Sequence, residues 1–260
     1  MLHYRMRVPI DEGSGPTVVL LHGIGTSAEY WRKTVDKLRQ NNRVIAVDML
    51  GFGISPKPLD INYSAADQAR ALRRALWSRR MRGKIVLVGF SLGGIVAVEF
   101  ATRYPGKVSK LVLVSLPIYL NKNQMSKEIL GRWQTVLSGT LNKTYVQFYK
   151  QIREQPKLTQ NFLKTHKRLL PQFNHMEVTD VTWHGFAMSL DNAIERQRTA
   201  RQLKRINCPI ELFYGSFDPV IIRANVLLLQ KTLPQAKFHM VAGGHDLPLK
   251  YFAQIAKACR

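Results

Sequence analysis

Short apolar runs alternate along this chain with longer amphipathic stretches, and this alternation restricts the fold more than any other feature of the sequence. Residues 17–21 are β-branched or apolar throughout, which is typical of a strand buried on both faces of a sheet. Similar runs occupy 44–48, 85–89, 111–115, 210–214 and 237–241. Helices are predicted over 27–40, 64–81, 92–104, 191–205, 220–231 and 247–258. The alternation predicts an α/β fold: a mostly parallel sheet with helices on both faces.

Two regions depart from the alternation. At the amino end, Leu2–Pro9 fits one strand before the turn-forming residues 11–16, so we expect a sheet of about seven strands. From 117 to 190 there is no convincing buried strand, and the composition, rich in Lys, Gln and aromatic residues, indicates several helices. We therefore expect a core built from 1–116 and 191–260, with a helical cap inserted at 117–190.

The most specific local motif is Gly89-Phe90-Ser91-Leu92-Gly93, which lies where a predicted strand ends and a predicted helix begins. Such a turn strains the serine backbone and exposes its hydroxyl at the carboxyl edge of the sheet. Side chains two positions before and after the serine would collide with the turn, which explains glycine at 89 and 93. The plainer interpretation is a turn whose serine caps the helix. We favour Ser91 as a nucleophile, because suitable companions occur elsewhere in the chain.

A serine hydroxyl becomes a good nucleophile when a base takes its proton and a carboxylate orients that base. His245 follows the last predicted strand in a glycine-rich segment, and Asp218 follows the strand at 210–214. Both positions fall at the same edge of the sheet as Ser91. Two other carboxylates are rival candidates for the orienting acid, Asp48 and Asp191.

Acyl transfer also needs N–H donors for the oxyanion. The Leu92 N–H, immediately after the serine, is one candidate. The second is the Ile24 N–H, which lies between two glycines after the strand at 17–21, where the backbone can approach a substrate closely. His22, at the start of that loop, is expected to shape the loop and not to act as the base.

Together, five ordered segments make the chain resemble the α/β-hydrolase fold family over nearly its whole length: 20–25, 47–55, 89–93, 215–218 and 243–245. The resemblance is to its serine-nucleophile, capped, esterase-like branch. It implies Ser91 as nucleophile, Asp218 as acid and His245 as base, with Ile24 and Leu92 forming the oxyanion hole. It also implies that the cap lies between the strands that the family counts as six and seven. The family opens with an antiparallel pair of strands, and this chain has room for one strand of that pair.

A serine at position 91 excludes the similar branches with an aspartate nucleophile, the haloalkane dehalogenases and epoxide hydrolases. Hydrolysis of a carboxylic ester through an acyl-enzyme intermediate is the expected reaction. Thioester hydrolysis and carbon–carbon bond hydrolysis on the same three residues stay open, as does a non-enzymatic small-molecule receptor on the same fold. The reaction implies no metal and no organic cofactor, and two cysteines are too few for a zinc cluster or a disulfide framework.

The charge is strongly basic: 39 Lys and Arg against 17 Asp and Glu give +22. This excess suggests three kinds of partner: nucleic acid, an anionic membrane surface and an acidic substrate. No ordered basic groove or nucleic-acid module is visible, so we expect no specific nucleic-acid partner. We expect a small-molecule acyl substrate, anionic ones included, and at most weak attraction to anionic membranes. No apolar run suits a membrane-spanning helix, and the cysteine usage and the start of the chain favour a cytoplasmic protein.

Overall fold

The computed structural model describes residues 3–81, 83–121, 124 and 183–260. In this part of the chain, seven strands form one sheet with the order β1-β3-β2-β4-β5-β6-β7. Its strands are β1 (Arg7–Glu12), β2 (Thr17–Leu21), β3 (Arg43–Asp48), β4 (Ile85–Phe90), β5 (Val108–Val114), β6 (Ile210–Gly215) and β7 (Lys237–Val241). Strand β1 pairs antiparallel with β3, and the other neighbours pair in parallel. The predicted fold class is confirmed.

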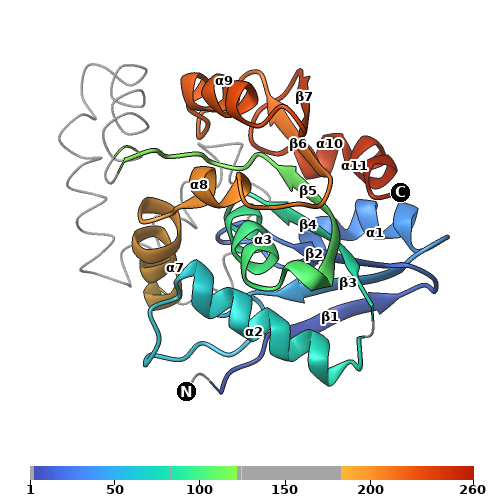
Figure 1. Cartoon of the computed structure of the whole chain (residues 1–260). Coiled ribbons are helices and arrows are strands. Elements are labelled where there is room, and N and C mark those ends of the chain that lie inside the picture. The colour runs from blue at the N-terminus through green and yellow to red at the C-terminus, as the bar shows by residue number, and fades with distance from the viewer. Residues whose placement is uncertain (1–2, 82, 122–123, 125–182) are drawn as a thin grey trace, which may run out of the picture.

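Helices cover both faces of this sheet. They are α1 (Arg32–Leu38), α2 (Ala65–Ser78), α3 (Leu92–Arg103), α7 (Trp183–Ser189), α8 (Thr199–Leu203), α9 (Arg223–Thr232), α10 (Leu247–Lys250) and α11 (Phe252–Ala258). Helices α2, α3 and α8 lie on one face, and α1 and α11 pack together on the other (Figure 1). The helix predicted over 191–205 is split, because a π-helical segment at Leu190–Glu195 ends before α8 begins.

Alternate residues of the strands supply two separate cores. In β2, Val19 and Leu21 belong to the core under α2 and α3, whereas Val18 and Leu20 belong to the core under α1 and α11. All four side chains are fully buried. A run of apolar residues without polar alternation is what a strand needs when both of its faces are covered. The two cores fix the carboxyl ends of the parallel strands at one edge of the sheet.

The first strand lies later in the sequence than predicted, at Arg7–Glu12 and not at Leu2–Pro9. Asp11 and Glu12 are typical of a turn in the sequence. In the structure they belong to the strand, and Asp11 accepts hydrogen bonds from Arg43 at 2.8 Å and from Arg79 at 3.0 Å. The Arg43 guanidinium lowers the pKa of the Asp11 carboxyl, which keeps it ionised. Opposite charges supplied by distant parts of the chain thus let an acidic residue occupy a strand.

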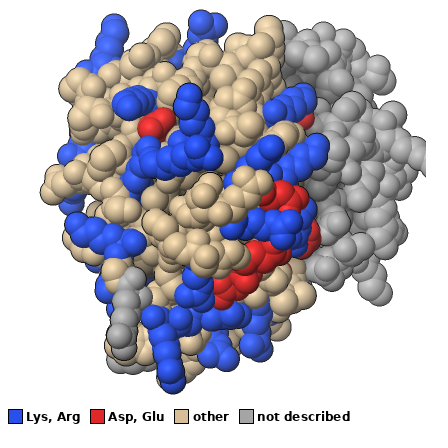
Figure 2. Space-filling model, turned by 90° about the vertical axis from the view of Figure 1, so that its right-hand side faces the viewer, with Lys and Arg blue, Asp and Glu red and all other residues tan. Residues whose placement is uncertain are grey.

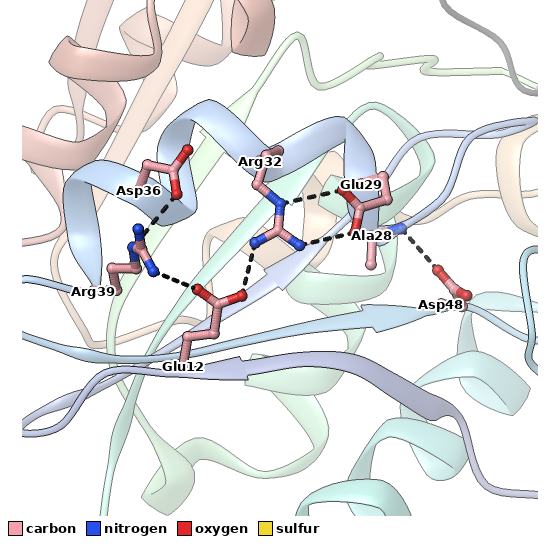
Figure 3. Close-up of polar contacts among 7 residues, drawn as sticks. All are labelled: Glu12, Ala28, Glu29, Arg32, Asp36, Arg39 and Asp48. Carbon is pink, nitrogen blue, oxygen red and sulfur yellow. Dashed lines mark hydrogen bonds and ion pairs between the residues drawn. The ribbon is translucent and has the colours of Figure 1, made fainter.

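Glu12, the last residue of β1, is held in the same way (Figure 3). Its carboxylate accepts from Arg32 at 2.7 Å and from Arg39 at 3.2 Å, and both arginines also pair with acids of their own helical turn. Hydrogen bonding to Arg32 lowers the pKa of Glu12. These ion pairs join β1 to the helix region that covers one face of the sheet.

The predicted cap falls between β5 and β6, which are strands six and seven in the count of the resembled family. Residues 125–182 lie outside the described part of the chain, so the boundaries 117–190 stay a prediction. At the far end of the insertion, α7 lies against the loop that follows β3: the rings of His184 and Tyr63 meet edge to face at 5.8 Å. Among the described helices, none combines the length and the apolar character needed to cross a bilayer.

Candidate active site

Ser91 occupies the sharp turn between β4 and α3, with φ +52° and ψ −117°. A positive φ is unfavourable for a residue with a side chain and persists where the surrounding structure enforces it. The Ser91 N–H donates to the carbonyl of Val114 at 2.9 Å, which ties the turn to the neighbouring strand. The serine stands at the N-cap of α3, yet its side chain makes no capping hydrogen bond. The interpretation of Ser91 as a mere helix cap is therefore wrong.

Two glycines permit this turn. A Cβ atom on Gly89 would lie 2.4 Å from the carbonyl oxygen of Gly93, and one on Gly93 would lie 2.4 Å from that of Leu21. These neighbours are backbone atoms, which cannot rotate away as a side chain can. Glycine at both positions lets the helix start directly against the strands.

Replacing Gly89 with alanine is expected to lower the free energy of unfolding by about 2–3 kcal/mol, because the added methyl group forces the backbone apart. Gly106→Ala is the matched control, since a Cβ atom there meets nothing within 4 Å. Urea denaturation followed by circular dichroism measures both variants. Equal stability of the two would contradict the packing argument.

His245 connects the serine to a buried carboxylate. Its Nε2 atom lies 3.0 Å from Ser91 Oγ, and its Nδ1 atom lies 2.8 Å from Asp218 Oδ2. A carboxylate accepts, so Nδ1 carries the proton and Nε2 is left as an acceptor for the serine hydroxyl. The Asp218 side chain is fully buried, and its second oxygen accepts from the Val220 N–H at 2.9 Å. The three predicted residues thus meet in one hydrogen-bonded chain.

The loops that carry Asp218 and His245 touch each other closely. The Phe217 N–H donates to the carbonyl of Gly243 at 2.9 Å. A Cβ atom on Gly215 would lie 2.3 Å from that same carbonyl oxygen, so glycine is needed where the loops after β6 and β7 cross. The Tyr251 hydroxyl donates to the carbonyl of Ala242 at 2.8 Å and fixes the start of the histidine loop.

Two contacts to the histidine, and a ring that supports one of them, are not apparent from the sequence motifs. The ring of Phe90 lies 5.1 Å from that of His245 and stacks on Tyr30 at 5.0 Å. The hydroxyl of Ser115 donates to the carbonyl oxygen of His245 at 3.3 Å. Ser115 directly follows the carboxyl end of β5, whereas the sequence predicts it as the last residue of the strand at 111–115. The aromatic pair had no sequence signal, because Tyr30 lies in a separate helical turn.

His22 and Asp48 have structural partners. His22 Nε2 accepts from the Met49 N–H at 2.9 Å, so Nδ1 carries the proton and donates to the carbonyl of Gly23 at 2.7 Å. Burial lowers the pKa of His22, which keeps the ring neutral. The two oxygens of Asp48 accept from the N–H groups of Ala28 and Ile54 at 2.7 and 2.8 Å (Figure 3 shows the first). Asp48 shapes two loops, whereas Asp218 contacts the histidine.

The two predicted oxyanion donors lie on segments next to the serine. Leu92 is the first residue of α3, and the first N–H groups of a helix have no acceptor within it. Ile24 lies in the loop after β2, where a Cβ atom on the preceding Gly23 would come within 3.4 Å of the Ser91 Cβ. The loop that carries Ile24 therefore passes directly beside the serine.

Two further histidines of the described part of the chain pack against other rings, His184 against Tyr63. His239 stacks on Phe213 at 4.4 Å and hydrogen-bonds Glu211 at 3.0 Å, on the strands. His166 and His175 lie outside the described residues. Within residues 3–81, 83–121, 124 and 183–260, no three His, Cys, Asp or Glu side chains are grouped to hold a metal ion.

Comparison with known proteins gives a consistent result. The model of the family described as "alpha/beta hydrolase fold" matches residues 16–250. RutD of Escherichia coli, provisionally named as a carbamate hydrolase, is 27% identical over 91% of this chain and 86% of its own length. BODYGUARD 1 of Arabidopsis thaliana, provisionally named as a lysophospholipase, is 24% identical over 92% of this chain but 56% of its own length. The chain thus spans little more than half of that relative.

Solved structures show the same architecture. A thermophilic esterase from Thermogutta terrifontis superimposes with a TM-score of 0.73 at 22% identity, covering 97% of this chain and 90% of the esterase. At this identity the likeness concerns the fold alone.

Proposed function

Since the chain belongs to the α/β hydrolase fold family, we propose that it hydrolyses carboxylic esters through an acyl-enzyme intermediate. The observation that carries this proposal is the pair of hydrogen bonds running from Asp218 through His245 to Ser91. Each residue fits one role: Ser91 is the nucleophile, His245 the general base and Asp218 the acid that orients it.

In the proposed mechanism, Ser91 Oγ attacks the ester carbonyl carbon while its proton moves to His245 Nε2. The negative charge on the carbonyl oxygen is stabilised by the N–H groups of Leu92 and Ile24. The tetrahedral intermediate collapses, and the leaving alcohol takes the proton from Nε2. Water then repeats the sequence on the acyl-enzyme, releasing the carboxylic acid and restoring the serine.

The buried carboxylate supports this division of roles. The Asp218 side chain is fully buried, whereas the His245 side chain is 20% exposed. The carboxylate therefore faces the imidazole without competing water and stabilises the imidazolium formed during attack. The exposed part of the imidazole lets a leaving group or a water molecule exchange protons with it.

The basic surface supports an anionic substrate as the more specific part of the proposal. Lys and Arg are spread over the face shown in Figure 2, and Asp and Glu gather mainly in one band. Several described acids are already engaged by cations, as Asp67 is by Arg70 and Glu99 by Arg103. The remaining positive charge would raise the local concentration of a small anionic ester. A cytoplasmic location and weak attraction to anionic membranes belong to the same proposal.

A fluorophosphonate probe and a panel of substrates test the proposal. The protein should label at one site, and p-nitrophenyl esters of graded chain length should be cleaved faster than an acyl-coenzyme A thioester or a diketone acid. Turnover of an anionic ester should fall as salt rises, while that of a neutral ester should not. A preference for the thioester or the diketone acid would replace ester hydrolysis by those reactions. Absence of labelling would favour a receptor.

A further inference from the structure

Two strained serines directly follow the ends of neighbouring strands. Among the described residues, Ser91 after β4 and Ser115 after β5 both have positive φ, of +52° and +48°. The strand residues immediately before them, Phe90 and Val114, are register partners in the sheet. The two serines therefore lie side by side at the carboxyl edge, each in a conformation that a residue with a side chain seldom adopts.

Both serines form hydrogen bonds with His245, one with its side chain and the other with its backbone. The Ser91 hydroxyl lies 3.0 Å from the imidazole Nε2 of His245, and the Ser115 hydroxyl donates to the His245 backbone carbonyl at 3.3 Å. Ser115 is fully buried, and its own N–H donates to the carbonyl of Phe213 at 2.8 Å. Its position is thus fixed by β6, the strand that leads to Asp218.

We propose that Ser115 is a positioning residue, whose hydroxyl anchors the backbone of His245 so that the imidazole stays within reach of Ser91. The inference rests on the proposed function for its effect on catalysis. The histidine loop contains two glycines, 243 and 244, and is therefore intrinsically free to move. The Ser115 hydroxyl, held at the rigid end of β5, removes part of this freedom by donating a hydrogen bond. The strained backbone of Ser115 directs that hydroxyl toward the loop.

Two substitutions separate the hydroxyl from the strain. Ser115→Ala removes the hydroxyl and keeps the side chain at positive φ, whereas Ser115→Gly removes the hydroxyl and relieves the strain. Ser78→Ala is the matched control, because its hydroxyl also donates to a backbone carbonyl, that of Ala75, but on helix α2. Both Ser115 variants should react with the fluorophosphonate probe about five- to tenfold more slowly than wild type, as for one lost hydrogen bond. The control should react at the wild-type rate.

The stoichiometry of labelling distinguishes positioning from a merely structural role. If Ser115 positions the histidine, every molecule labels eventually, kcat falls and KM stays unchanged. Partial labelling at an unchanged rate would overturn the proposal, because it would mean that a fraction of the protein is misfolded. A wild-type rate in Ser115→Ala, or recovery of that rate in Ser115→Gly, would overturn it as well.

Hydrogen–deuterium exchange tests the anchor without relying on activity. A peptide spanning 243–247 should exchange faster in both Ser115 variants than in wild type and in Ser78→Ala. Unchanged exchange would overturn the anchor. If wild type itself fails to label, ester hydrolysis is wrong, and faster exchange in the variants would still support the anchor as a structural contact.

Discussion

Ser91→Ala is expected to lower kcat on any ester substrate by roughly 10⁴- to 10⁶-fold, because the proposed nucleophile is removed and the oxyanion donors alone remain. Steady-state hydrolysis of a p-nitrophenyl ester and intact-mass detection of the fluorophosphonate adduct measure the effect. The variant should fold as wild type does, since alanine is smaller than serine at a buried turn. Adduct formation at the wild-type rate would show that another residue is the nucleophile.

A glycine at the same position provides the control for backbone strain. Because glycine accepts φ +52° without penalty, Ser91→Gly should be more stable to unfolding than Ser91→Ala by about 1 kcal/mol. Both variants should be equally inactive. Retained activity in either one would contradict the role assigned to the hydroxyl.

Asp218→Asn is the second large expected effect, a fall in kcat of roughly 10³- to 10⁴-fold. An asparagine amide that presents N–H to Nδ1 favours the wrong tautomer of His245, in which Nε2 carries the proton and cannot accept one from Ser91. Titration of active sites by the probe, followed by single-turnover kinetics, measures the loss per folded molecule.

Asp246→Asn is the matched control, because it removes a carboxylate beside the histidine in sequence. Asp246 pairs instead with Lys250 at 3.1 Å on a partly exposed surface. Its replacement should change kcat less than about twofold, as expected for an exposed ion pair. Similar losses in both variants would indicate a general electrostatic effect in place of a specific orienting acid.

The sequence predicts much of the site because strand ends obey simple geometry. Ser91 and Asp218 follow buried strands and His245 follows the partly exposed strand β7, and parallel strands bring their carboxyl ends to one edge. Glycine at 89 and 93 indicates the tight turn that presents Ser91. None of this required knowledge of tertiary contacts, since it follows from the order of apolar runs and the space that a tight turn needs.

Other features depend on contacts that the sequence does not encode locally. The predicted bounds of the first strand were wrong because the charge of Asp11 is neutralised by Arg43 and Arg79, which lie 32 and 68 residues away in the sequence. In the sequence Ser115 is the last residue of an apolar run, and its hydrogen bond to the His245 carbonyl is evident only in the folded chain. The rejection of Asp48 as the orienting acid likewise depends on two backbone N–H groups that only folding brings to its side chain.

The crossing of the loops at Gly215 and Gly243 gives the proposed acid and the proposed base a common backbone frame. The loops that carry Asp218 and His245, both within the last fifty residues, contact each other through backbone atoms, as in the hydrogen bond from the Phe217 N–H to the Gly243 carbonyl. The proposed nucleophile Ser91 and the proposed oxyanion donors Ile24 and Leu92 come from the first hundred residues. A side chain at position 215 would displace the loops of Asp218 and His245 relative to each other, because its Cβ atom would lie 2.3 Å from the Gly243 carbonyl oxygen.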